Sequence, residues 1–167
     1  NQSWYSTYSN RPGKLFAGVE QRLTILISGN KAGKIYTSKY FHWYEKQRIF
    51  LFESISYTHG RIIQNRNMPF KIGNETVNNI IDKIMAKKNT LTNYTGSGKY
   101  NSWYHDGPTY WIRALPFEPV GNKSARSSHY HKISSPTEIS KYVITAVLNS
   151  STFYLFYKSI SNCRDLG

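Results

Sequence analysis

The alternation of hydrophobic and polar residues predicts strands in the N-terminal third of the chain. Residues 22–28 (RLTILIS) are rich in β-branched residues and apolar on both faces, which is typical of a strand inside a sheet. After a turn at residues 29–33, residues 34–41 (KIYTSKYF) predict a second strand, and we expect the two strands to form a hairpin. Residues 1–21 are punctuated by asparagine, proline and glycine, so we expect a loop there.

Two further segments of the first half are expected to be helical. Residues 42–55 (HWYEKQRIFLFESI) predict a helix whose buried side carries Tyr44, Leu51 and Ile55. Residues 74–89 have the clearest helical pattern, because their apolar residues follow the spacing of one buried face, and Asn74 is suited to cap this helix. The apolar residues of that face are Val77, Ile80, Ile81, Ile84 and Met85.

The second half opens with another expected hairpin. Residues 99–105 (KYNSWYH) and 109–115 (TYWIRAL) are rich in aromatic residues and flank the turn signal Asp106-Gly107-Pro108. Residues 119–137 follow, and we expect them to form a loop that contains no acidic residue.

The chain closes on two expected helices that we interpret as a clamp for a sheet. Ser135 is expected to begin a capping box with Pro136 at the first helical position. The segment 149–151 interrupts the pattern and is suited to cap the second helix. The two buried faces are expected to be formed by Ile139, Tyr142, Val143, Ala146 and Val147, and by Phe153, Phe156, Tyr157 and Ile160.

These elements together predict an α+β fold with a mixed sheet, two hairpins and about four flanking helices. A chain of 167 residues is long enough to bury a substantial core. Because the sequence begins at Asn1 without a methionine, we expect it to be a piece of a longer polypeptide. With no signal-type segment and no apolar run long enough to span a bilayer, we expect a cytoplasmic location.

Charge adds the first indication of a partner. The chain has 22 lysine and arginine residues against nine acidic residues, which gives a formal charge of +13. Such an excess favours binding to a polyanion, and nucleic acid is the first candidate. The basic residues are spread along the sequence, so they would form a binding surface only after folding. The alternative is that the charge only reflects composition or solubility.

The sequence offers little evidence for a catalytic site. The segments 29–34 (GNKAGK) and 95–100 (TGSGKY) do not fit a phosphate-binding loop, because no serine or threonine follows the Gly-Lys pair. The acidic residues do not have the spacing of a metal-dependent nuclease. His129 and His131 lack a nearby third ligand for zinc, and Cys163 is a single cysteine without an evident base. We therefore expect neither catalysis nor a bound metal or cofactor in this chain.

Five blocks of the sequence carry a family resemblance: SNRPGKLFAGVEQRLTI, TSKYFHWYEKQRIFLFESISY, MPFKIGNE, YWIRALPFEP and AVLNSSTFYLFYKSISNCRDL. They cover nearly the whole chain, and the first and last are the most specific as a pair. In the same order, these blocks resemble bacterial adenine-N6 DNA methyltransferases of restriction–modification systems, including single-chain restriction–methylase fusions.

The resemblance implies that residues 1–60 contribute late strands of a methyltransferase domain and that residues 61–167 form a TaqI-like target recognition domain. The glycine-rich S-adenosylmethionine loop and the Asn-Pro-Pro-aromatic motif of this family do not occur in the sequence. The parent enzyme would use S-adenosylmethionine and methylate adenine, with or without an endonuclease activity of its own, whereas this piece would only recognise the duplex. Its partners would be double-stranded DNA and the rest of the parent chain, and no membrane.

The candidate DNA contacts lie mainly in the acid-free loop. A DNA-modifying enzyme must hold the duplex while one nucleotide is flipped out, with phosphate contacts giving affinity and base contacts giving sequence choice. We expect phosphate contacts from Lys123, Arg126 and Lys132, and contacts to phosphates or base edges from Ser127, Ser128 and His129.

Other candidates lie outside this loop, and some of them have a structural alternative. Arg113 lies within an expected strand and would contact guanine, a phosphate or an acidic partner. Tyr100 and Trp103 would line the DNA groove or belong to the core, and Arg164 would contact DNA or cap the last helix. Under the family resemblance, Arg11 and Lys14 would lie near the flipped base.

Two other functions remain open at this point. An RNA-binding module would have the same excess of basic and aromatic residues, and it would prefer RNA or single strands in competition. A docking module would use its surface to bind other domains of the parent, and its positive charge would be incidental.

Overall fold

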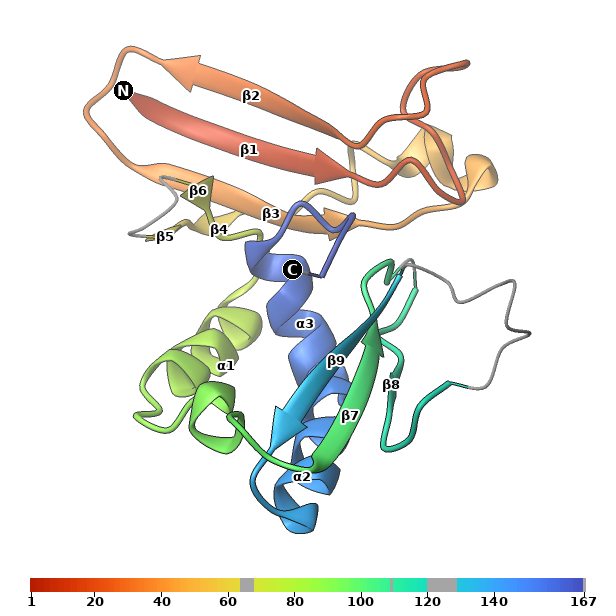
Figure 1. Cartoon of the computed structure of the whole chain (residues 1–167). Coiled ribbons are helices and arrows are strands. Elements are labelled where there is room, and N and C mark those ends of the chain that lie inside the picture. Colours follow the sequence, from red (N-terminus) through yellow and green to blue (C-terminus); the bar gives the residue numbers. More distant parts are fainter. Residues whose placement is uncertain (64–67, 109, 120–128, 167) are drawn as a thin grey trace. The chain divides into compact units, whose positions relative to one another are not determined.

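The computed structural model describes residues 1–63, 68–108, 110–119 and 129–166, and it divides into two compact units, residues 1–85 and 86–167. Both units combine strands and helices, so the predicted α+β class is confirmed (Figure 1). The division falls after Met85 rather than after residue 60, because the helix that ends at Met85 bonds to the first unit. Thr58 Oγ1 donates to Glu75, the first residue of that helix, and Arg61 forms an ion pair with Asp82.

The first unit contains a four-stranded mixed sheet in the order β2-β1-β3-β4. Its strands are β1 (Gln2–Tyr8), β2 (Leu23–Gly29), β3 (Ile35–Phe41) and β4 (Thr58–His59). Strand β1 is antiparallel to β2 and parallel to β3, which makes the sheet mixed.

Strand β1 corrects two predictions. The loop expected over residues 1–21 is wrong in its first part, where Gln2–Tyr8 form strand β1 although they lack a regular alternation of polar and apolar residues. The hairpin expected from β2 and β3 is also wrong, because β1 lies between them. Strand β2 is therefore at an edge of this sheet rather than inside it, and Leu26 and Ile27 are exposed.

The helix expected over residues 42–55 is shorter than predicted. It is a 3-10 helix, η1 (Glu45–Phe50), followed by turns. Leu51 is buried as expected and Ile55 is half-buried, but Tyr44 is exposed. The core beneath this segment consists of Tyr8, Leu15, Phe41, Trp43 and Leu51.

The remaining elements of the first unit are two short strands and one helix. Strands β5 (Ile62–Ile63) and β6 (Met68–Pro69) pair with each other. Helix α1 (Glu75–Met85) confirms the predicted helix, and the Val77 N–H donates to the Asn74 side chain at 2.9 Å, which confirms the cap.

The second unit contains a three-stranded antiparallel sheet in the order β8-β7-β9. The 3-10 helix η2 (Leu91–Tyr94) precedes β7 (Tyr100–His105), and β8 (Ala114–Leu115) pairs with β7 as the predicted hairpin requires. Strand β9 (Tyr130–Ser135) was expected to be part of a loop. It pairs with β7 along the whole of that strand, so the expectation of a loop is wrong for these residues.

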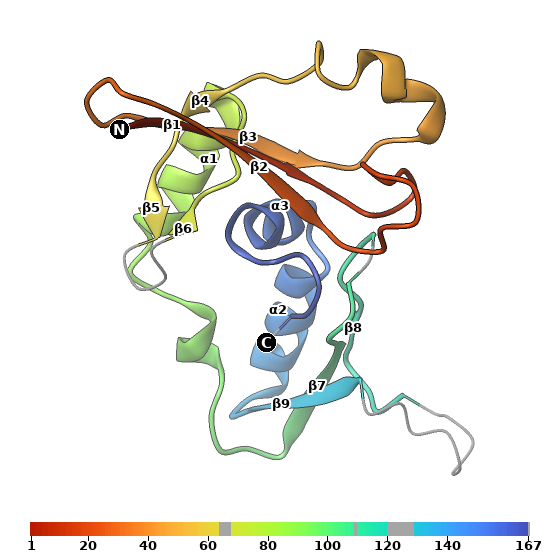
Figure 2. The same ribbon diagram turned by 90° about the horizontal axis from the view of Figure 1, so that it is seen from above.

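Helices α2 (Glu138–Leu148) and α3 (Ser151–Ile160) confirm the predicted pair (Figure 2). Ser150 caps α3, as the interruption at residues 149–151 indicated. Helix α2 starts two residues later than expected, because the Thr137 side chain, rather than that of Ser135, accepts the capping bond from the Ser140 N–H at 3.0 Å.

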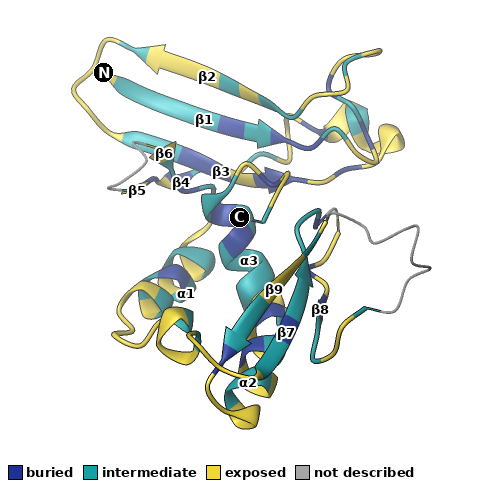
Figure 3. Cartoon of the chain, viewed as in Figure 1, coloured by how far each residue is buried: buried dark blue, intermediate teal, exposed yellow. Residues whose placement is uncertain are grey.

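The face of α2 that packs on the sheet also differs from the prediction. Ile144 and Leu148 are the buried residues of α2. Figure 3 colours the elements of the chain by burial. The buried Ser102 hydroxyl of β7 donates to the Lys141 carbonyl at 3.0 Å and lies 3.2 Å from the Thr145 hydroxyl. Polar residues thus belong to the inner face of α2, which is why hydrophobicity alone selected the opposite face. The expected stripe is exposed at Ile139, Tyr142, Val143, Ala146 and Val147.

Asn149 shows how the helix pair holds the sheet. Its side-chain oxygen accepts from the Ala114 N–H at 2.9 Å, and its side-chain nitrogen donates to the Ala114 carbonyl at 2.8 Å. These two bonds fix β8 to the junction of the helices. Within the described part of the chain, no helix is both long enough and apolar enough to cross a membrane.

Candidate nucleic-acid interface

The β8-β7-β9 sheet has an inner face that packs on the helices and an outer face that does not. Ser102 defines the inner face through its bonds to α2. Because successive side chains of a strand point to opposite faces, Tyr104 shares the inner face with Ser102, whereas Trp103 and His105 point outwards. The core on the inner side is formed mainly by Ile112, Ala114, Ile144, Leu148 and Tyr157.

The strand register places basic and aromatic residues beside each other on the outer face. Trp103 is paired with Lys132 of β9 and with Leu115 of β8. His105 is paired with Tyr130, and its N–H donates to the Arg113 carbonyl at 2.9 Å. We call the residues that share this side of the sheet the outer face: Trp103, His105, Arg113, Leu115, Tyr130 and Lys132.

Arg113 and Lys132 are exposed, and Trp103, His105 and Tyr130 are half-buried. The Arg113 guanidinium lies over the Tyr130 ring, 5.4 Å from its centre. This ring contact is what the structure shows for Arg113, and none of the described residues forms an ion pair with it. Cations beside accessible aromatic rings are suited to neutralise phosphates and to contact bases.

A carboxylate joins two histidines at the end of β7. Asp106 Oδ1 lies 2.9 Å from His129 Nδ1, and Asp106 Oδ2 lies 2.9 Å from His131 Nε2. We call these three residues the Asp106 cluster. The hydrogen bond from His131 lowers the pKa of Asp106 most, and that from His129 lowers it further, while burial acts in the opposite direction.

His105 links the Asp106 cluster to the outer face. Its ring stacks on that of His129 with centres 5.5 Å apart. Burial lowers the pKa of His105, and the nearby positive charge of Arg113 lowers it further, so His105 favours its neutral form. The Gly107 N–H donates to His105 Nδ1 at 3.0 Å, which fixes the ring.

The structure brings together three of the predicted contact residues, Trp103, Arg113 and Lys132. His129 lies at the adjacent Asp106 cluster. Lys123, Arg126, Ser127 and Ser128 lie outside the described residues.

The other predicted contact residues lie elsewhere. Tyr100 alternates onto the inner face at the start of β7, with Lys99 5.3 Å from its ring centre. The side chain of Arg164 forms an ion pair with Asp165 at 3.6 Å. Arg11 and Lys14 belong to the first unit, where Arg11 is exposed and Lys14 pairs with Glu20.

Tyr130, His105 and Asp106 are residues of this surface that the sequence analysis did not select. Asp106 was assigned only to a turn. The segment Tyr130-His-Lys-Ile133 has no period-two alternation, so no local pattern marked Tyr130, and its place follows from the pairing of β9 with β7.

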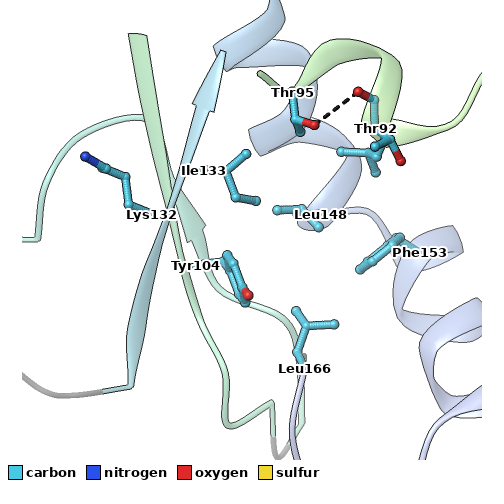
Figure 4. Close-up of a pocket in the computed structure, with 9 residues that line it drawn as sticks. Thr92, Thr95, Tyr104, Lys132, Ile133, Leu148, Phe153 and Leu166 are labelled. Carbon is cyan, nitrogen blue, oxygen red and sulfur yellow. Dashed lines mark hydrogen bonds between the residues drawn. The ribbon is translucent and has the colours of Figure 1, made fainter. Parts of the chain in front are cut away.

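The inner side of the sheet contains a cavity of about 350 Å³ (Figure 4). Side chains of Tyr104, Ile133, Leu148 and Phe153 converge on it, whereas that of Lys132 points away. The cavity is mainly apolar and lies on the face opposite to Trp103. Across the described ranges, no group of three or more His, Cys, Asp or Glu residues is arranged to hold a metal ion.

Comparison with known proteins found no matching family model, no matching curated protein and no matching solved structure.

Proposed function

We propose that this chain binds double-stranded DNA and that the outer face of the β8-β7-β9 sheet is part of the contact surface. The observation that supports the proposal is the grouping of Arg113 and Lys132 with the rings of Trp103 and Tyr130 on one side of one sheet. These four residues come from three separate segments of the chain, and strand pairing brings the segments together.

The charge of the chain supports the same proposal. Lysine and arginine exceed acidic residues by 13, so the chain as a whole attracts a polyanion. From His129 to Lys132, the side chains of His129, His131 and Lys132 are exposed and that of Tyr130 is half-buried. This part of the acid-free segment is therefore accessible to a partner.

The resemblance of the sequence blocks to adenine-N6 DNA methyltransferases supports a more specific role. In this proposal the chain recognises the target duplex for a parent restriction–modification enzyme that uses S-adenosylmethionine and methylates adenine. The chain itself would supply recognition and no catalysis, and the parent would act in the bacterial cytoplasm.

A charge-matched pair of variants tests the outer face. Arg113→Ala/Lys132→Ala removes two cations from it, whereas Lys31→Ala/Lys34→Ala removes two exposed cations from the turn between β2 and β3. In fluorescence anisotropy with a labelled duplex, we expect the first variant to lose about tenfold or more in affinity and the second less than about threefold. Equal losses in both variants would mean that only net charge matters.

Competition distinguishes the alternatives. Unlabelled duplex DNA should displace the labelled duplex better than single-stranded RNA or DNA of the same length. A preference for single strands would identify the outer face as a base-stacking platform instead. If the chain retains no duplex even at low salt, a docking module becomes the better description.

A further inference from the structure

The Asp106 cluster lies at the end of β7, where His131 is paired with Tyr104 and therefore belongs to the side of the sheet opposite to Trp103 and Lys132. Its contact with the outer face is the stacking of His129 on His105. Its carboxylate is the less accessible part, with the Asp106 side chain 23% exposed, whereas those of His129 and His131 are 62% and 47% exposed. The imidazoles therefore face solvent while the carboxylate holds them from behind.

Protonation reverses the sign of the charge on this cluster. With both imidazoles neutral, the cluster carries the single negative charge of Asp106. With both imidazoles protonated it carries a net charge of +1, because two positive charges outweigh the one carboxylate. Histidine is the side chain that proteins generally use as a proton-dependent switch near neutral pH.

Arg113 is a cation that acts on this region: it lies in the segment before β8, and its positive charge acts on His105. Lys132 follows His131 on β9 but points to the opposite side of the sheet. The C-terminal tail packs here through the Leu166 N–H, which donates to the Asp106 carbonyl at 2.7 Å, and its Arg164 and Asp165 pair with each other. His105 favours its neutral form and Tyr104 is uncharged, since burial and the charge of Asp106 raise the pKa of Tyr104.

We propose that Asp106, His129 and His131 form a proton-dependent binding site for a phosphate of the nucleic-acid backbone. This inference rests on the proposed function and adds a phosphate contact at the end of β7 to those of the outer face. The protonated His131 donates its Nε2 proton to Asp106 and its Nδ1 proton to a phosphate oxygen, while His129 supplies a second positive charge. Asp106 is a positioning residue, which orients the rings without touching the phosphate.

Inorganic phosphate tests the site without DNA. The imidazole signals of the full chain are followed by NMR during a phosphate titration at pH 6 and at pH 8, at constant ionic strength. We expect saturable shifts of the His129 and His131 signals at pH 6 and much smaller shifts at pH 8. The exposed His59 of β4 is the internal control. Equal responses of His59 and His131, or no response at pH 6, would overturn the site.

Duplex binding measured between pH 6 and pH 8 tests whether the Asp106 cluster contributes to DNA binding. For each proton taken up on binding, the affinity should fall by up to about tenfold per pH unit as the pH rises. The His129→Gln/His131→Gln variant should lose this dependence, whereas His59→Gln should keep it. A second variant, Asp106→Asn, removes the negative charge, so at pH 8 it should bind the duplex about twofold more tightly than the unaltered chain.

The two proposals fail in different ways. If phosphate shifts the histidine signals but no duplex binds at either pH, the site stands and the proposed function fails. If the duplex binds equally at pH 6 and pH 8, the proposed function stands and the phosphate site is wrong.

Discussion

At the scale of single residues, Asp106 connects the end of β7 to the start of β9 in the second unit. It immediately follows β7, its N–H donates to the His129 carbonyl at 2.9 Å, and its carboxylate contacts both His129 and His131. One residue therefore fixes the start of β9 against the end of β7. Removal of its carboxylate should loosen this connection without disturbing the core.

The lowered pKa of Asp106 gives the sign of a pH effect on stability. A carboxyl whose pKa is lower in the folded state stabilises the fold above its unfolded pKa of about 3.8, and this contribution is lost as the pH falls through the folded value. At pH 5, the free energy of unfolding of Asp106→Asn should therefore be lower than that of the unaltered chain by about 1 kcal/mol. The difference is small because Asp106 is partly exposed and solvent screens its contacts. That difference corresponds to about 2–4 °C in melting temperature.

Thermal unfolding at pH 5 and below pH 3 checks this effect. The variant and the unaltered chain should differ at pH 5 and converge at the lower pH. A difference that persists in acid would show that the substituted side chain perturbs the fold by something other than the loss of charge.

At the scale of elements, the junction of α2 and α3 determines how the short strand β8 is held. β8 has only two residues, so its ladder to β7 is short. The Asn149 side chain adds one donor and one acceptor to Ala114, as a neighbouring strand would. The interruption between the two helices thus caps α3 and also stabilises β8 through Ala114.

Asn149→Ala should destabilise the second unit by about 1–3 kcal/mol, because it removes two hydrogen bonds and leaves the Ala114 backbone groups without those partners. Amide exchange of Ala114 should accelerate in this variant. Asn79→Ala on the exposed side of α1 is the control, and it should leave Ala114 exchange unchanged. Unchanged Ala114 exchange in Asn149→Ala would show that β8 does not depend on this side chain.

At the scale of the whole molecule, the excess of basic residues predicts how duplex binding responds to salt. Each phosphate contact releases counterions, so the affinity falls steeply as salt rises. For a chain of formal charge +13 that makes six or more phosphate contacts, we expect a loss of at least about a thousandfold between 50 and 200 mM salt.

The slope of this salt dependence also tests the outer face. Plotted as the logarithm of affinity against the logarithm of salt, Arg113→Ala and Lys132→Ala should each reduce the slope by about one. Anisotropy titrations at four or more salt concentrations measure it. A slope that neither substitution changes would place the phosphate contacts away from these two cations.

The sequence by itself determined the elements whose signals are local. The spacing of apolar residues and the cap Asn74 located α1, and the turn at Asp106 located the β7–β8 hairpin. The break at residues 149–151 located the end of α2 and the start of α3. The excess of positive charge and the scarcity of acidic residues are likewise properties of composition alone. Caps, turns and helical periodicity depend on neighbouring residues, and that is why they can be predicted without the fold.

Only the tertiary structure decided which strands pair and which faces meet. β1 separates β2 from β3, and β9 forms from a segment that resembles a loop, because pairing depends on partners distant in sequence. The inner face of α2 was missed because hydroxyl contacts from Ser102 and Thr145 favour it over the more apolar stripe. The alignment of Trp103 with Lys132, and of two histidines with Asp106, follows from the β7–β9 register, which no local pattern specifies.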